Sequence, residues 1–275
     1  MATTQKAAPK KQGFQGVKNA IIILIFAFIV AALFYELVLG NVNNFTDATR
    51  EVPKQGNMLG TIYKGGFVVP IIFGLLFSVI ALSVERILGI SACAGKGNVT
   101  KFVANIKAAI KADDFAKAQQ LCDKQGGSIG NVVGATLKAY TEMESANGMK
   151  KKEKIARIQQ AHEEATQLEM PTMTMNLPII ATIVTLGTLT ALFGTVLGMI
   201  RSFAALASDG GADSSALSTG ISEALVNTAS GIATSWFAVV SYNYFTNRID
   251  KLTYAIDEIG YTIAQTYEVK HAEEA

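Results

Sequence analysis

Four long apolar runs constrain this chain more than any other feature of its sequence. They lie at residues 20–39, 66–90, 177–203 and 217–247, and only Glu36 interrupts the first of them, AIIILIFAFIVAALFYELVL. About 20 apolar residues in a helix cross the hydrocarbon core of a bilayer, so every run is long enough to span it. Only 17% of the residues are charged, against about a quarter in soluble domains. The sequence therefore predicts an all-α, polytopic membrane helical bundle.

The distribution of Lys and Arg predicts how these spans are oriented, because cytoplasmic loops keep positive charge. Residues 1–19 carry four basic residues, 91–176 carry twelve and 248–275 carry three, whereas 204–216 carry none. The loop at 40–65 carries three basic residues, partly balanced by two acidic ones. We expect a cytoplasmic tail at 1–19, periplasmic loops at 40–65 and 204–216, and both termini in the cytoplasm.

The N-terminal run at 20–39 has an alternative interpretation. A basic start followed by an apolar run also fits a cleaved secretory signal peptide. The run at 20–39 approaches full spanning length and ends in YELVLG without a small-x-small cleavage site, which favours an uncleaved additional transmembrane helix.

In the segment 91–176, apolar residues such as Phe102, Ile106 and Ile110 recur at helical spacing. That segment is expected to form a long cytoplasmic helical extension of the bundle, and 248–275 a cytoplasmic C-terminal helix and tail.

The third and fourth runs carry uncharged polar residues where lipid would favour apolar ones. At about 100° per residue, Thr188 and Thr195 share one face of the third run, and Asn227, Thr228 and Ser235 share a face of the fourth. Small and hydroxyl side chains permit close helix packing, and for each single residue that explanation stays open. As a set, with the costlier Asn227 among them, they favour a path for ions or protons, or a groove for a partner's polar group.

Charged residues lie near the ends of the predicted spans. Glu223 is either an interfacial acid favoured by the helix dipole or an acid at the mouth of the polar path. Glu85 and Arg86, at the cytoplasmic edge of the second span, serve as interfacial anchors or pair with neighbouring subunits. Arg201, near the external end of the third span, extends toward the interface or pairs with an acid.

Several function classes find no support in the sequence. Cys93 and Cys122 show no metal-ligand spacing, and His162 and His271 belong to no hydrolytic or HExxH pattern. A net charge of only +2 predicts no field for nucleic acid. We therefore expect no enzyme activity, no catalytic residues, no cofactor and no metal.

The polar runs carry a resemblance to a known family. The segments LFGTVLGMIRSF at 192–203, LSTGISEALVNTASGI at 217–232 and AVVSYN at 238–243 resemble the MotA/TolQ/ExbB proton-channel family, most closely its ExbB branch. The family's pore threonines correspond to Thr195 and Thr228 and its acid to Glu223. The resemblance implies an inner-membrane homopentamer, surrounded by lipid, around the helices of an ExbD-like single-span partner that supplies the protonated aspartate.

That resemblance also implies a function and leaves alternatives. In the ExbB branch, proton flow drives a motion that is passed to a TonB-like protein, which energises outer-membrane transport. A TolQ-like envelope-maintenance subunit or a motility stator is the alternative within the family. A secondary transporter is a different class, for which the chain has no internal repeat and too few spans. In a purely structural scaffold the polar faces would serve packing alone.

Overall fold

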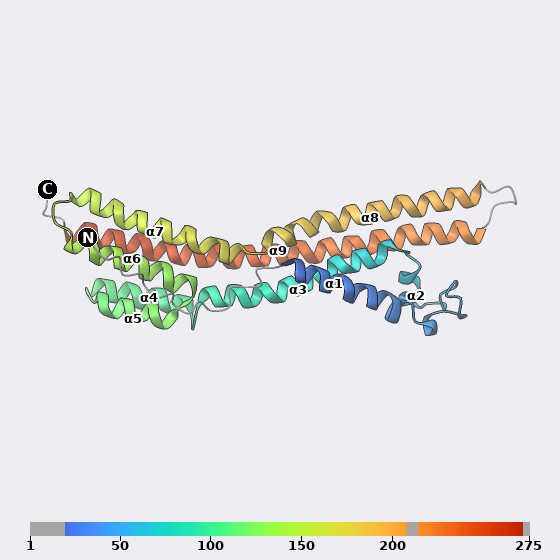
Figure 1. The fold of residues 1–275 in the computed structure, drawn as a ribbon, viewed down its shortest axis with the longest axis horizontal. Helices are drawn as coiled ribbons and strands as arrows, with labels where there is room; N and C mark the ends of the chain where they lie inside the picture. Colours follow the sequence, from blue (N-terminus) through green and yellow to red (C-terminus); the bar gives the residue numbers. More distant parts are fainter. Residues whose placement is uncertain (1–19, 208–213, 272–275) are drawn as a thin grey trace, which may run out of the picture. The chain divides into compact units, whose positions relative to one another are not determined.

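The computed structural model describes residues 20–207 and 214–271. The predicted tail at 1–19, positions 208–213 of the loop predicted at 204–216, and the last four residues lie outside that description. The predicted all-α class is confirmed: within the described ranges the chain is helical, and its only β-type pairing is an isolated bridge between Phe45 and Pro53 (Figure 1).

Residues divide into two compact units, which we name by composition. The apolar unit comprises described residues 20–84, 176–207 and 214–244, and the polar unit comprises 85–175 and 245–271. In chain order the helices are α1 (Ala20–Phe34), the π-helix η1 (Tyr35–Leu39), the 3-10 helix η2 (Val42–Asn44), α2 (Met58–Tyr63), α3 (Val68–Ala94), α4 (Val99–Lys111), α5 (Phe115–Gln125), α6 (Gly127–Ser145), α7 (Lys151–Thr174), α8 (Leu177–Leu206) and α9 (Ser214–Lys270).

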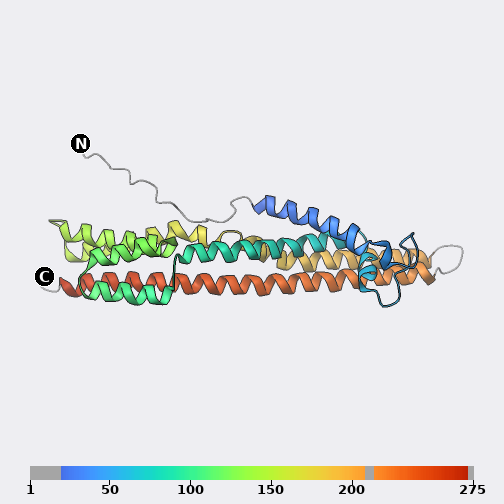
Figure 2. The ribbon, with the colours of Figure 1, turned by 90° about the horizontal axis from the view of Figure 1, so that it is seen from below.

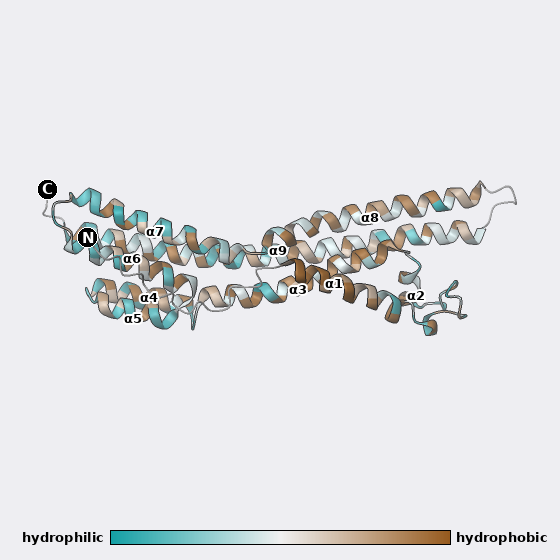
Figure 3. Ribbon diagram, viewed as in Figure 1, coloured by the Kyte–Doolittle hydropathy of each residue, from teal (hydrophilic) through white to brown (hydrophobic). Residues whose placement is uncertain are grey.

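Four helical stretches are long and apolar enough to cross a membrane: Ala20–Leu39, Val68–Lys111, Leu177–Leu206 and Ser214–Lys270. Figure 3 shows α1 as strongly hydrophobic and α7 as largely hydrophilic. Side chains such as Ile25, Phe26 and Leu189 are more than half exposed. Large apolar side chains are stable in that position when lipid or another protein covers them. The chain is a multi-pass membrane protein.

In the apolar unit, α1 packs along α3, and Figure 2 shows the two helices side by side. The ring of Phe34 lies 5.5 Å from the rings of both Phe73 and Phe77. Ala27 and Ala31 of α1 are buried, because their small side chains let the helix approach its neighbours closely. The opposite face of α1 carries the exposed side chains, as expected of a helix at the edge of a membrane bundle.

The polar unit is a helical bundle built from α4 to α7 together with the last part of α9. Its core includes Ile106, Tyr140, Ile158 and Ile256, all fully buried. Side-chain caps start two of its helices: the Asn98 amide oxygen accepts from backbone N–H groups at the start of α4, and Asp114 does the same for α5. Ion pairs tie α9 to the bundle, such as that between Lys107 and Glu258 at 2.5 Å.

Candidate functional site

The polar faces predicted on the third and fourth runs lie against each other, on α8 and the first half of α9. The hydroxyl oxygens of Thr195 and Thr228 are 2.5 Å apart, and those of Thr188 and Ser235 are 2.9 Å apart. Both views show α8 running beside this part of α9 (Figures 1 and 2). We call this contact, with its hydroxyl groups, the hydroxyl seam.

The seam follows from residue spacing. Thr188 and Thr195 are seven residues apart on α8, and their partners Ser235 and Thr228 are seven apart on α9. Seven residues make about two helical turns, so the pairs stack along one stripe of each antiparallel helix. A further step of seven leads to Ser202, whose hydroxyl donates to the Leu217 carbonyl at 3.2 Å. The helical period places Ser202 on the same stripe as Thr188 and Thr195, but the sequence-based site does not include it.

Small residues bring the two helices into close contact. Gly231 of α9 faces Ala191 and Gly187 of α8; a β-carbon at Gly231 would overlap that of Ala191 and lie 2.6 Å from the Gly187 carbonyl oxygen. Only glycine therefore permits this separation of the helices. The packing explanation and the polar-path explanation consequently apply to the same stripe, since close approach is what brings the hydroxyls within hydrogen-bond range.

Each central hydroxyl of the seam has a choice of acceptors. Thr195 can donate to the carbonyl of Ala191 at 2.9 Å, and Thr228 to that of Ala224 at 3.0 Å, or either can donate to the other. A hydroxyl has one proton and two lone pairs, so it passes a hydrogen bond on without holding a charge. Both threonines are partly exposed in this single chain, and Thr188 is exposed, whereas Ser235 is buried. A neighbouring chain or water can therefore reach the central pair.

Glu223 and Arg201 form an ion pair in the apolar unit. One guanidinium nitrogen of Arg201 donates to both carboxylate oxygens of Glu223, each at 2.7 Å. The carboxylate side chain is only 4% exposed, whereas that of Arg201 is 54% exposed. Burying a carboxylate costs free energy unless it is paired, and charge-assisted hydrogen bonds supply that compensation. The ion pair with Arg201 therefore compensates the cost of burying the Glu223 carboxylate.

Asn227 occupies a different position from the hydroxyl groups. Its side chain is fully buried, and its amide nitrogen donates to the backbone carbonyl of Gly65 at 3.0 Å. Gly65 belongs to the turn before α3, so Asn227 connects α9 to that turn. Asn227 also packs against Gly194 of α8, the neighbour of Thr195, because a β-carbon at Gly194 would lie 2.7 Å from the Asn227 side chain. It therefore borders the hydroxyl seam while it hydrogen-bonds a different segment.

Glu85 and Arg86 pair with each other in the polar unit. Two guanidinium nitrogens of Arg86 donate to the Glu85 carboxylate, the Nε at 2.6 Å. Arg86 is fully buried and Glu85 nearly so. Breaking a buried pair of this kind leaves an uncompensated charge, which makes either single substitution costly.

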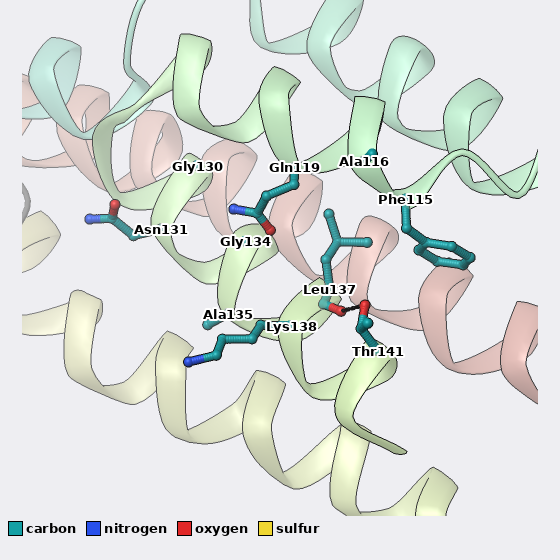
Figure 4. Close-up of a pocket in the computed structure, with 10 residues that line it drawn as sticks. All are labelled: Phe115, Ala116, Gln119, Gly130, Asn131, Gly134, Ala135, Leu137, Lys138 and Thr141. Atoms are coloured by element: carbon teal, nitrogen blue, oxygen red, sulfur yellow. Dashed lines mark hydrogen bonds between the residues drawn. The ribbon is translucent and has the colours of Figure 1, made fainter. Parts of the chain in front are cut away.

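Among the described residues, the other groups that could carry chemistry lie apart from one another. Over the described ranges, His, Cys, Asp and Glu form no cluster of three that could hold a metal. Cys93 and Cys122 are both buried. Figure 4 shows a groove between α5 and α6 that is lined by residues including Phe115, Gln119, Leu137 and Lys138. Its ten lining residues include no catalytic pair.

Comparison with known proteins shows what part of the chain resembles. Residues 130–258 match the model of the MotA/TolQ/ExbB proton channel family. Over these residues the chain is similar to that family. It is 39% identical over 87 residues to a Synechocystis protein named as a biopolymer transport protein, ExbB-like 3, covering 31% of this chain and 41% of that one.

Two further members of the MotA/TolQ/ExbB family are similar over comparable lengths. The Tol-Pal system protein TolQ of Pseudomonas aeruginosa is 30% identical over 118 residues, 43% of this chain and 51% of TolQ. An ExbB homolog of Methanothermobacter thermautotrophicus is 36% identical over 93 residues, 34% of this chain and 33% of that protein. The matches thus span a third to a half of the length of these relatives.

The matched residues of the MotA/TolQ/ExbB model coincide with the candidate site. They contain the whole of α8 and the first part of α9, and hence the hydroxyl seam, Arg201, Glu223 and Asn227. Helices α1 and α3, with Glu85 and Arg86, lie before the match. The contact of Asn227 with Gly65 therefore joins a family segment to a part of the chain outside it.

Proposed function

We propose that this chain is a non-enzymatic, ExbB-like subunit of a motor that uses the proton-motive force to energise TonB-dependent outer-membrane transport. It lies in a bacterial inner membrane with both termini in the cytoplasm, as its basic residues favour. Five copies surround the membrane helices of an ExbD-like partner, and the motion is passed to a TonB-like protein. The observation that carries the proposal is the hydroxyl seam, inside the segment that matches a proton-channel family.

The proposed mechanism assigns a separate task to each polar group. The partner supplies the carboxyl group that binds and releases the proton. Thr195 and Thr228, which are partly exposed, bridge that group and water because each hydroxyl can exchange donor and acceptor roles. Thr188 and Ser235 continue the route along the seam. Glu223, held by Arg201, draws protons toward the entrance.

Valine substitutions test the mechanism, since valine keeps the shape of threonine but removes its hydroxyl. Thr195→Val and Thr228→Val should abolish gradient-driven function while the complex still assembles in the membrane. Thr234→Val is the matched control: Thr234 is buried in the same helix, and its hydroxyl donates to the carbonyl of Ser230 in its own helix. Normal gradient-driven activity in both seam variants would refute the proton path.

The alternative within the family is a TolQ-like envelope-maintenance subunit or a motility stator, and the similarity to TolQ supports keeping it. Complementation separates the roles. The chain, produced with its own single-span partner, should restore energised outer-membrane uptake in a strain that lacks ExbB. Restoration of envelope integrity in a strain lacking TolQ, without restored uptake, would transfer the proposal to the TolQ role.

A further inference from the structure

Two side chains of α9 contact the turn that precedes α3. Gly65 and Gly66 form this turn, between the end of α2 at Tyr63 and the start of α3 at Val68. Glu223 and Asn227 are four residues apart on α9, so they lie on the same face of the helix. Asn227 donates from its amide nitrogen to the Gly65 carbonyl at 3.0 Å, and Glu223 lies against Gly66.

Gly66 fits closely beneath the Glu223 carboxylate. Its φ is +77°, in the left-handed region that glycine adopts without strain, and a β-carbon there would overlap Glu223 Oε1. The carboxylate therefore has the Gly66 backbone on one side, while Arg201 donates to it at 2.7 Å. A shift of the turn would change the space available to Glu223 beside Arg201.

Packing alone does not explain why residue 227 is an asparagine. The side chain is fully buried and its carbonyl oxygen, Oδ1, finds no hydrogen-bond donor among residues 20–207 and 214–271. A buried acceptor without a donor opposes folding, and a leucine of similar size would carry no such group. What Asn227 alone supplies is the hydrogen bond to Gly65.

We propose that Asn227 is a positioning residue for Glu223. By holding the Gly65 carbonyl it fixes the Gly65–Gly66 turn, and the turn in turn keeps the Glu223 carboxylate against Arg201. The proposal rests on the proposed function only in giving Glu223 a role in the proton route. It adds that the Gly65–Gly66 turn, which lies before the family match, sets the position of Glu223, which lies within it.

The test measures the reactivity of Glu223 directly. Membranes that contain the full complex are treated with dicyclohexylcarbodiimide at neutral pH, and modified Glu223 is quantified by peptide mass spectrometry. In Asn227→Leu the turn is released, and the labelling rate of Glu223 should rise about three- to tenfold, the factor that one hydrogen bond represents. Gly66→Ala perturbs the same turn from the other side and should also raise the rate.

Internal references make the result specific. Glu36 has a side chain that is 58% exposed, and its labelling should be equal in all variants. Asn247→Leu, at an exposed asparagine of the same helix, is the matched control and should leave Glu223 unchanged. The proposal is overturned if the labelling rate of Glu223 changes by less than about twofold in both Asn227→Leu and Gly66→Ala, because the loss of one hydrogen bond predicts a larger change. An equal rise at Glu36 would do the same.

Failure of this proposal can be told apart from failure of the proton path. Labelling reports the surroundings of one carboxylate and needs no proton flux. If the valine variants of Thr195 and Thr228 retain activity while Asn227→Leu changes Glu223 labelling, the path is refuted and the positioning role stands. If the valine variants are inactive while the labelling of Glu223 is unchanged in Asn227→Leu, the proton path stands and the positioning role is refuted.

Discussion

Gly231→Ala should separate α8 from α9 and disrupt the hydroxyl seam. The added β-carbon would lie 2.6 Å from the Gly187 carbonyl oxygen, whereas carbon–oxygen contacts are comfortable at about 3.3 Å or more. Because the overlap with the Ala191 β-carbon is tighter still, the helices must move apart by at least about 0.7 Å at this point. Ser235, one turn from Gly231, now lies 2.9 Å from Thr188, and the same displacement lengthens that contact to about 3.6 Å, which is no longer a hydrogen bond.

The cost combines two terms. Overpacking costs about 1–3 kcal/mol, and a lost hydrogen bond about 0.5–1.5 kcal/mol. We expect Gly231→Ala to lower stability by about 1.5–4.5 kcal/mol in total. Thermal unfolding of the detergent-solubilised protein measures this loss, and gradient-driven activity measures whether the seam still functions.

Two companion variants make this reasoning refutable. In the double variant Gly231→Ala with Ala191→Gly, the methyl group moves to the other helix, which relieves the overlap with Ala191 and should recover part of the stability. Ala229→Val, at an exposed position of α9, should change nothing. Wild-type stability in Gly231→Ala, or a double variant no better than the single one, would show that the helices are not held together by this contact.

Two further predictions concern the polar unit. Burial raises the pKa of Tyr140 to about 12, and no described residue hydrogen-bonds its hydroxyl; Tyr140→Phe should therefore leave thermal stability equal or slightly higher at neutral pH. Above the ordinary tyrosine pKa of about 10, wild type should lose stability as pH rises and the variant less so. Lys270 pairs with Asp113 and Glu144 and is 39% exposed; Lys270→Met should cost under about 1 kcal/mol, and high salt should remove the difference.

Local patterns account for much of the fold that was predicted from the sequence. Runs of apolar residues identify helices of spanning length without knowledge of any neighbour, because lipid requires each helix to satisfy its own backbone. The same periodicity places Thr188 and Thr195 on one face of a helix, since 3.6 residues make a turn wherever the helix lies. The roles of these residues in proton movement remain predictions.

Contacts between distant segments could not be predicted in this way. Nothing in the spacing of Glu223 and Asn227 indicates that Glu223 lies against Gly66 and that Asn227 bonds Gly65. Both glycines are more than 150 residues earlier in the chain. Periodicity reports which side of a helix a residue occupies, whereas the partner on that side depends on how the helices pack. For the same reason the sequence pattern groups Asn227 with the hydroxyls, although Asn227 hydrogen-bonds a different segment.

The sequence by itself determined that this is an all-α membrane protein with small and polar faces on two of its helices, because apolar length and helical period are local properties of a chain. Tertiary structure alone decided which faces meet. It brought Thr195 to Thr228 and Arg201 to Glu223, and it joined Asn227 to the turn before α3. The physical reason is that hydrogen bonds and close packing require distances of a few ångströms between atoms, and those distances arise only when whole helices have packed together.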